Sequence, residues 1–589
     1  MKKNHLSPLV LLLALATVLS TVSLFPQSAQ AAEWNSPEAS QQRTTPIPNR
    51  NAFHVLTYHD VFATLAQKQA VDDSGAITVD ELARQFSWLR DNGYAVVSVQ
   101  QIINSRNGGA PLPTRAVMLS FDDGYKSVHT HVLPLLRLFG YPATLAIVGN
   151  WIDSPDTSLI EYETSRTERA QFMSWAEIRD CLESGLVEIA SHSFDMHHGV
   201  PSNPQGNKQP AAITRRFDEA TKQYESEASY ETRLRSDLAR NSSVLKDRLG
   251  ISVRTVVWPY GAYNKIAQRV AVEQGLTVGF TLDPGANGDD VSLAGLRREL
   301  IAHDTTSADI AIIMRPRSIR TERVVSIDVS KHFGLKGGDD AAMLSRLVDR
   351  VTALRPTTIV LTQPLQPGTG TAFFPNVSRA VHADVLNRIA WQLRTRAGVR
   401  VFVEDPGQIV TGTKELTRDL GRYVAFTGLT RDMQPNEPSN DEALALNLIR
   451  ENRPTAELMR RLKAPVRCGD SFSPEKLLAT MKAPWGSATA VGNWVLLRVA
   501  GVAARGCTLS WWQRFADVAA QMPEAMQRTI IEVDGAQPDT ERGVVRPLLD
   551  AYAAGFRHLA YAQDDLQANV PDIKAVSRVI STETSPLKK

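Results

Sequence analysis

The chain has 589 residues, of which 43% are hydrophobic and 22% are charged, and its formal net charge at pH 7 is +2. This length allows two large domains, and without a dense basic run nothing indicates a nucleic-acid partner. Three cysteines are too few for a disulfide scaffold or a thiolate metal site. Cys468 and Cys507 could pair in an oxidising compartment, but the sequence alone does not show whether they do.

The N-terminus has the pattern of a secretory signal peptide. Lys2 and Lys3 precede an apolar run over residues 9–25, and Ala29-Gln30-Ala31 matches an A-x-A cleavage site. We expect cleavage near Ala31, with an uncleaved anchor as the alternative. No cysteine follows the run to carry a lipid, and no later segment is apolar enough to span a membrane. We therefore expect an exported protein with a flexible leader over residues 32–50.

Strand and helix patterns alternate through a first domain, which we place at residues 51–310. Strands are expected at residues 53–58, 94–99, 115–121, 141–148 and 186–190, with a further one leading into residues 258–261. Helices are expected from capping boxes at residues 78–81 and 174–177, over residues 127–139, and over residues 231–249. Between them, residues 199–229 are polar and are interpreted as a surface excursion.

The alternation restarts after residues 315–323 and predicts a second domain over residues 311–589. Its strands are expected at residues 324–328, 357–361, 399–404, 423–427, 494–499, 529–533 and 558–561, with a helix over residues 381–396. The predicted fold class is therefore α/β, with two (β/α) barrels.

Four strand ends of the first domain carry residues suited to hydrolysis at a metal ion. Asp123, His192 and His197 form an O/N/N ligand set that fits one divalent transition ion, such as Zn, Ni or Co, with an open coordination position. Asp122 is placed to take a proton from water at such an ion, and His59 to protonate the leaving group. His192 and His197 are separated by i, i+5, so they share no face of a straight helix and need a turn between them.

These residues resemble the first three motifs of the metal-dependent polysaccharide deacetylases, carbohydrate esterase family four. The resemblance is carried by Ser-Phe-Asp-Asp-Gly at residues 120–124, by His192-Ser…His197, and by Arg254 before Trp-Pro-Tyr-Gly at residues 258–261. It implies roles for six residues: Asp122 as base, Asp123, His192 and His197 as metal ligands, Arg254 as the residue that orients the base, and the Tyr260 backbone N–H as an oxyanion donor.

Three further features narrow the resemblance. They are a histidine spacing one residue longer than usual, the early segment at residues 56–60, and a second barrel containing Ile-Ala-Trp-Gln-Leu-Arg-Thr-Arg at residues 389–396. They are similar to the periplasmic poly-β-1,6-N-acetyl-D-glucosamine N-deacetylases of biofilm export. In that branch the barrel is circularly permuted and the early histidine, here His59, acts as the catalytic acid; His303 is the competing candidate. The resemblance implies partial N-deacetylation of the polymer in the periplasm, with the exopolysaccharide synthase and the outer-membrane export porin as partners to consider.

The second domain departs from the pattern of full-length relatives, whose glycoside-hydrolase-like barrel carries acids at its strand ends. Asp328 remains after the first strand, but the second acid of that motif is Ser330, and residues 426–430 lack the acids of the fourth strand. Four other carboxylates could serve without a recognisable pattern: Glu404, Asp432, Glu532 and Asp534. Since cleavage generally needs two placed carboxylates, we expect this barrel to bind glycan without cleaving it. Asp328 would pair with a sugar amine, and the candidate stacking aromatics are Phe373, Phe374 and Trp494.

Two alternatives to this function remain. The same site could deacetylate chitin oligomers, peptidoglycan or acetylated xylan. From a different class, the protein could be a weakly catalytic, glycan-binding export chaperone. The intact set of Asp122, Asp123, His192 and His197 argues against the chaperone.

Overall fold

The computed structural model describes residues 51–582, apart from residues 71–74, 163–164, 203–205, 207, 302–304, 315–320, 410–413, 434–439, 463–465, 469–472, 474–475, 477, 480, 482–493, 501–507, 523–524 and 538. The predicted signal peptide and leader therefore lie outside the described residues, as do His303 and Cys507.

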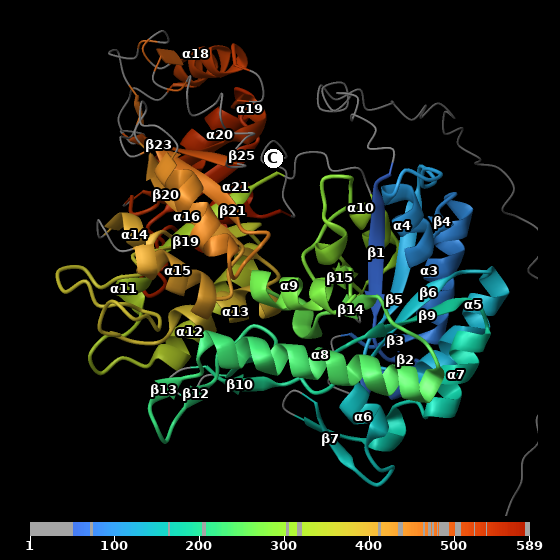
Figure 1. The fold of residues 1–589 in the computed structure, drawn as a ribbon. Helices are drawn as coiled ribbons and strands as arrows, with labels where there is room; N and C mark the ends of the chain where they lie inside the picture. The colour runs from blue at the N-terminus through green and yellow to red at the C-terminus, as the bar shows by residue number, and fades with distance from the viewer. Residues whose placement is uncertain are drawn as a thin grey trace, which may run out of the picture. The chain divides into compact units, whose positions relative to one another are not determined.

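The first domain is built on an eight-stranded sheet in which neighbouring strands run parallel, in the order β15-β14-β9-β6-β5-β1-β16, with β4 also paired to β5 (Figure 1). The strands are β1 (Phe53–Tyr58), β4 (Ala95–Val96), β5 (Ala116–Phe121), β6 (Ala143–Ile147), β9 (Val187–Ser191), β14 (Thr255–Val257), β15 (Val278–Phe280) and β16 (Glu299–Leu300). A bridge from Phe280 to Leu296 brings the segment before β16 beside β15, so the sheet curls toward a barrel.

Burial explains why the central strands form and where the site must lie. All residues of β5 and β6 are buried, as expected for parallel strands covered on both faces. Because the strands are parallel, their C-terminal ends meet at one edge of the sheet. Asp122 directly follows β5, His192 follows β9, and His59 follows β1.

Helices of the first domain begin at the expected capping residues. The capping boxes of Thr78 with Glu81 and of Ser174 with Glu177 are both formed. The helices are α2 (Leu65–Gln69), α3 (Val79–Asp91), α4 (Val99–Arg106), α5 (Leu133–Phe139), α6 (Gly149–Asp153), α7 (Trp175–Glu183), α8 (Glu227–Leu249), α9 (Lys265–Glu273) and α10 (Ser307–Ile313), with short helical turns η1 (Val128–Val132), η2 (Arg169–Gln171), η3 (Pro259–Gly261) and η4 (Leu293–Gly295).

Two expectations for this domain need correction. The strand expected at residues 94–99 is only β4, because Ser98 caps helix α4 and ends the extended segment. The excursion at residues 199–229 is structured and partly buried: Val200, Ala211 and Ala212 are in the core. Its short strands are β10 (Gly199–Pro201), β11 (Lys208–Pro210), β12 (Phe217–Asp218) and β13 (Gln223–Tyr224); the other minor strands are β2 (Val61–Phe62), β3 (Ile77–Thr78), β7 (Leu159–Tyr162) and β8 (Ser165–Glu168).

The second domain is a closed parallel barrel of eight strands, which together with the first sheet confirms the predicted fold class. Its strand order closes through the pairing of β21 with β23, and β22 pairs outside the ring. The strands are β17 (Arg323–Asp328), β18 (Thr358–Thr362), β19 (Arg400–Glu404), β20 (Gly428–Met433), β21 (Glu457–Leu462), β22 (Val466–Arg467), β23 (Trp494–Ala500), β24 (Thr529–Asp534) and β25 (His558–Ala562).

Helices lie between these strands along the chain, as the alternation predicted. They are α11 (Val329–His332), α12 (Asp340–Leu354), α13 (Leu386–Arg396), α14 (Pro406–Ile409), α15 (Lys414–Tyr423), α16 (Asn440–Arg450), α18 (Leu509–Ala520), α19 (Ala525–Arg528), α20 (Arg546–Ala553) and α21 (Ile573–Ile580), with the turn η5 (Glu541–Val545) before α20.

The strand expected at residues 423–427 is wrong. Tyr423 ends α15, the Val424 N–H still donates to the Leu420 carbonyl, and the strand begins only at Gly428. A side chain at Gly428 would meet the Glu457 carbonyl at 2.4 Å, so the close approach of β21 requires glycine there. Strand β21 itself was not anticipated.

The aromatic residues expected to stack on sugar are instead core residues. Phe373 and Phe374 are fully buried, and Trp494 packs with apolar side chains from the other barrel strands. Cys468 is disulfide-bonded, whereas Cys181 is a buried free thiol. Among the described residues, no helix has both the length and the apolar character needed to cross a membrane.

Candidate metal and catalytic site

The two adjacent aspartates lie at a sharp turn at the end of β5. Asp123 has φ +72° and Gly124 has φ +80°, so the chain reverses direction as soon as the strand ends. The Asp122 N–H still donates to the Tyr58 carbonyl of β1, at 3.0 Å. This turn separates the two carboxylates, which therefore contact different partners.

Asp123 lies between the two predicted histidine ligands. Its Oδ1 is 3.2 Å from His192 Nε2 and 3.3 Å from His197 Nε2, and all three side chains are buried. Their potential ligand atoms lie within 4.8 Å of one another, the one such group in the part of the chain that the structure describes. One carboxylate oxygen and two imidazole nitrogens are donors that a divalent transition ion prefers, so these residues fit the expected metal.

The orientation of both histidine rings is set by neighbouring groups. His192 Nδ1 is 2.7 Å from the Val257 carbonyl of β14, which leaves Nε2 to face Asp123. The His197 ring packs against Trp151 and Tyr260, with centroids 4.9 and 4.5 Å away. The turn required by the i, i+5 spacing is present, because Ser193 has φ +69°.

Asp122 is held by an arginine that the sequence analysis missed. Arg298 is fully buried, and its Nη1 donates to both carboxylate oxygens of Asp122, at 2.9 and 2.8 Å. The same nitrogen is 3.1 Å from Ser120 Oγ, and Arg298 Nε donates to the Thr281 carbonyl at 2.8 Å. Arg298 comes just before β16, 176 residues beyond Asp122 in the chain.

The expected role of Arg254 is therefore corrected. Arg254 precedes β14, at the opposite end of that strand from the site, and pairs with Glu188 at 2.8 Å. It also hydrogen-bonds the Gln100 side chain. Since these contacts point away from Asp122, Arg298 rather than Arg254 orients the predicted base.

The electrostatics favour ionised aspartates. Burial raises the pKa of Asp122, but the charges of Arg298, His192 and His59 outweigh it and lower that pKa overall. Burial likewise opposes ionisation of Asp123, yet His197 and His192 hold its pKa well below the usual range. Both carboxylates are thus ionised at neutral pH.

Tyr260 and His59 complete the set of predicted residues at this edge. Tyr260 has φ +58°, and its hydroxyl donates to the His197 carbonyl at 3.2 Å, which places the Trp-Pro-Tyr-Gly turn beside the ligands. A side chain at Gly261 would lie 2.4 Å from the Leu282 nitrogen, so this turn requires glycine. His59 is half-buried at the end of β1, and its charge acts on both aspartates.

The mouth of the second barrel contains a separate polar cavity of about 350 Å³, which includes Asp328. Asp328 accepts from Ser330 Oγ at 2.7 Å, and no ion pair of Asp328 is found within the described ranges. Arg461 of β21 pairs with both Glu404 and Asp432. Glu532 is fully buried and pairs with Arg498.

Comparisons with known proteins find similar sequences for parts of both domains. A family model for polysaccharide deacetylase matches residues 109–279, and one for hypothetical glycosyl hydrolase family 13 matches residues 338–407. The poly-β-1,6-N-acetyl-D-glucosamine N-deacetylase of Escherichia coli K12 is 32% identical over 382 residues, which cover 62% of this chain and 56% of that protein. The match thus spans about half the length of that relative.

Two solved structures are similar to the first domain. The de-N-acetylase from Aggregatibacter actinomycetemcomitans is 38% identical, with a TM-score of 0.42, covering 44% of this chain and 99% of that one. The BpsB deacetylase domain from Bordetella bronchiseptica is 41% identical, with a TM-score of 0.39, covering 43% and 96%. Over residues 109–279 the first domain is thus similar to the polysaccharide deacetylases, and this segment contains the buried Asp-His-His group.

Proposed function

We propose that the chain is a metal-dependent N-deacetylase of poly-β-1,6-N-acetyl-D-glucosamine. The observation that carries this proposal is the buried group of Asp123, His192 and His197 beside an arginine-bound Asp122. The substrate is inferred from the Escherichia coli relative, whose name gives this polymer as its substrate. We further infer that the protein acts in the periplasm during export for biofilm, with the synthase and export porin as candidate partners.

The proposed reaction adds water to an acetamide and releases acetate and an amine. A divalent ion held by Asp123, His192 and His197 would lower the pKa of water and polarise the acetyl carbonyl. Asp122, kept ionised by Arg298, accepts a proton from the attacking water. The Tyr260 backbone N–H donates to the oxyanion, and His59 delivers a proton to the leaving nitrogen.

The test compares acetate release from β-1,6-linked and β-1,4-linked N-acetylglucosamine oligomers. Chelation should abolish release, Zn, Co or Ni should restore it, and the β-1,6 oligomer should be the better substrate. His192→Ala should remain inactive at every metal concentration. The matched control is His129→Ala, because His129 pairs with Asp180 on another face of the domain. Undiminished turnover by chelated His192→Ala protein would overturn the metal site, and a preference for β-1,4 oligomers would overturn the substrate.

We also propose that the second barrel binds glycan without cleaving it. Arg461 pairs with both Glu404 and Asp432, so a cation already occupies these two carboxylates at the mouth. Asp328 lines the same cavity with only neutral hydrogen-bond donors, so it is suited to accept the ammonium group of a deacetylated sugar. The described residues of the cavity lining are mostly polar and include no aromatic side chain, so charge rather than stacking would select the ligand.

This second role is tested in the full chain with the deacetylase site disabled by Asp122→Asn. Partly deacetylated β-1,6 polymer should bind, and Asp328→Asn should weaken that binding. Asp534→Asn is the control. Asp534 ends β24 at the same end of the barrel, and its Oδ1 accepts the Ala536 N–H. Mass spectrometry should find oligomer lengths unchanged. Shorter products that require Asp328 would instead identify a hydrolase.

A further inference from the structure

The loop between the two histidine ligands is attached to the long helix α8 by one turn of that helix. Asp237 Oδ1 accepts the Phe194 N–H and its Oδ2 accepts the Asp195 N–H, both at 2.8 Å. Phe194 and Asp195 are the middle residues of the four that separate the ligands. One carboxylate therefore holds two consecutive peptide groups of the turn that the i, i+5 spacing requires.

The next turn of α8 holds the ends of β9, which precedes this loop, and of its neighbour β6. Asn241 is fully buried, and its Nδ2 donates to Ser191 Oγ at 2.7 Å and to the Ile147 carbonyl at 3.2 Å. The Arg240 guanidinium lies 3.7 Å from the centre of the Phe194 ring. Residues 237, 240 and 241 share one face of the helix, since i, i+3 and i, i+4 positions are neighbours.

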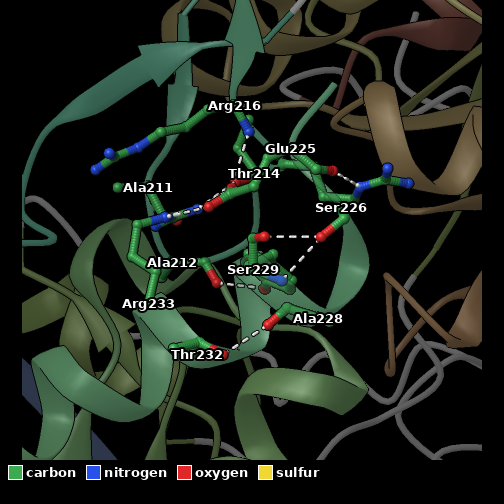
Figure 2. Close-up of polar contacts among 12 residues, drawn as sticks. Ala211, Ala212, Thr214, Arg216, Glu225, Ser226, Ala228, Ser229, Thr232 and Arg233 are labelled. Atoms are coloured by element: carbon green, nitrogen blue, oxygen red, sulfur yellow. Dashed lines mark hydrogen bonds and ion pairs between the residues drawn. The ribbon is translucent and has the colours of Figure 1, made fainter. Parts of the chain in front are cut away.

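The helix is itself held in place from the other side of the loop. Arg233, one turn before Asp237, donates to the Ala211 and Thr214 carbonyls at 3.0 and 2.8 Å, and it pairs with Glu225 at 2.9 Å, which Figure 2 shows around the start of α8. The Ala211 N–H in turn donates to the carbonyl of His198, the residue after the second ligand. The loop is thus tied to α8 near both of its ends.

We infer that Asp237 is a positioning residue for the metal site: its carboxylate shapes the turn between His192 and His197 and so directs both Nε2 atoms toward Asp123. This inference rests on the proposed metal-dependent function. Burial raises the pKa of Asp237 to about 6, although its two peptide hydrogen bonds act in the opposite direction. Burying this carboxylate therefore costs free energy, which an exposed surface aspartate would not lose. No element of the deacetylase motifs includes Asp237, which lies 40 residues beyond His197.

The experiment measures Zn²⁺ affinity of the full chain by competition with a chromophoric chelator, after the resident metal has been removed. Asp237→Asn replaces one acceptor by an NH₂ group that faces a peptide N–H, so the turn should loosen and the affinity should fall about 10- to 100-fold. Excess Zn²⁺ should restore most of the deacetylation rate. The control is Asp247→Asn on the same helix, because Asp247 is exposed and accepts a hydrogen bond from Ser243, away from the loop between the histidines.

The outcomes separate this inference from the proposed function. If the unaltered chain binds no Zn²⁺, the metal site itself is wrong. If it binds Zn²⁺ and folded Asp237→Asn binds equally well, only the role of Asp237 is overturned. Should Asp237→Asn fail to fold, Asp237→Glu keeps both acceptor oxygens and should give an intermediate affinity; affinity equal to that of the unaltered chain would then overturn the inference.

Discussion

Replacing Arg298 should lower the stability and the deacetylation rate far more than replacing Arg254, although Arg254 lies in the recognisable motif. Arg298→Met keeps an unbranched side chain of similar length but removes the guanidinium donors to Asp122 and to the Thr281 carbonyl. The Asp122 carboxylate is 3% exposed and would keep only the Ser120 hydroxyl as a partner. A buried charge without its counterion is the costliest result of this substitution.

The structure sets the size of the effect. Breaking a buried ion pair by removing one partner costs about 3–5 kcal/mol if the other group stays charged. The protein can avoid part of that cost by protonating Asp122, but a protonated Asp122 cannot act as a base, and a general base contributes about 10²- to 10⁴-fold. Either response lowers deacetylation strongly. Arg254 and Glu188, at 35% and 27% exposure, form a pair whose loss should cost no more than about 1 kcal/mol.

The assay compares thermal unfolding and acetate release for Arg298→Met, Arg298→Lys and Arg254→Met, each saturated with Zn²⁺. Arg298→Met should lose at least about 100-fold in rate, and Arg298→Lys should recover part of it because it restores the charge. Arg254→Met should stay close to the unaltered chain in both measurements. An equal or larger rate loss in Arg254→Met would refute the assignment and return the orienting role to Arg254.

Three further predictions concern Asp122, His59 and, in the second barrel, His558. Asp122→Asn should keep its metal by elemental analysis yet lose about 10²- to 10⁴-fold in acetate release; loss of metal would instead make Asp122 a ligand. His59→Ala should show a comparable rate defect with unchanged Zn²⁺ affinity, and a normal rate would remove His59 as the acid. In the second barrel, burial and the charge of Arg323 lower the pKa of His558 to about 3, and its Nδ1 accepts the Glu322 N–H. Because the unfolded chain binds this proton more tightly, stability should fall by about 1.4 kcal/mol per pH unit below pH 6.5; His558→Gln should flatten this dependence of the thermal midpoint, and parallel curves would contradict it.

The buried Asp-His-His group could be predicted from the sequence because its residues lie close to strand ends. Asp123 comes two residues after β5 and His192 directly after β9, and parallel strands bring such positions to one edge regardless of the loops between them. Hydrophobic runs identify those strands, and the adjacent polar residues identify the edge. The same reasoning placed His59 there without any knowledge of side-chain geometry.

Arg298 could not be found in this way. It follows Arg297 directly, and in an extended segment two successive side chains point to opposite faces, so one arginine is buried and the other is not. Leu296 is buried on the same side as Arg298, which is the one local signal of its direction. The partner, however, is 176 residues away, and no spacing rule connects the two. Only the pairing of β16 with β1 brings them together.

In the second barrel, prediction from strand ends fails in a different way. Carboxylates at these ends suggest a catalytic pair, but their ion-pair partner cannot be read from the sequence. Glu404 ends β19 and Asp432 lies near the end of β20, so position alone makes them look like a catalytic pair. Both are bound by Arg461, which belongs to β21, the strand that the hydrophobic pattern did not reveal. Arg461 is 12% exposed, so its two ion pairs are poorly screened by water, and one guanidinium occupies both carboxylates. Glycoside cleavage generally needs two carboxyl groups placed around the scissile bond, and the side chains of Glu404 and Asp432 are already engaged by the arginine of β21. Asp328 has no such ion pair among the described residues, which is why the proposed binding of a cationic sugar is assigned to this carboxylate.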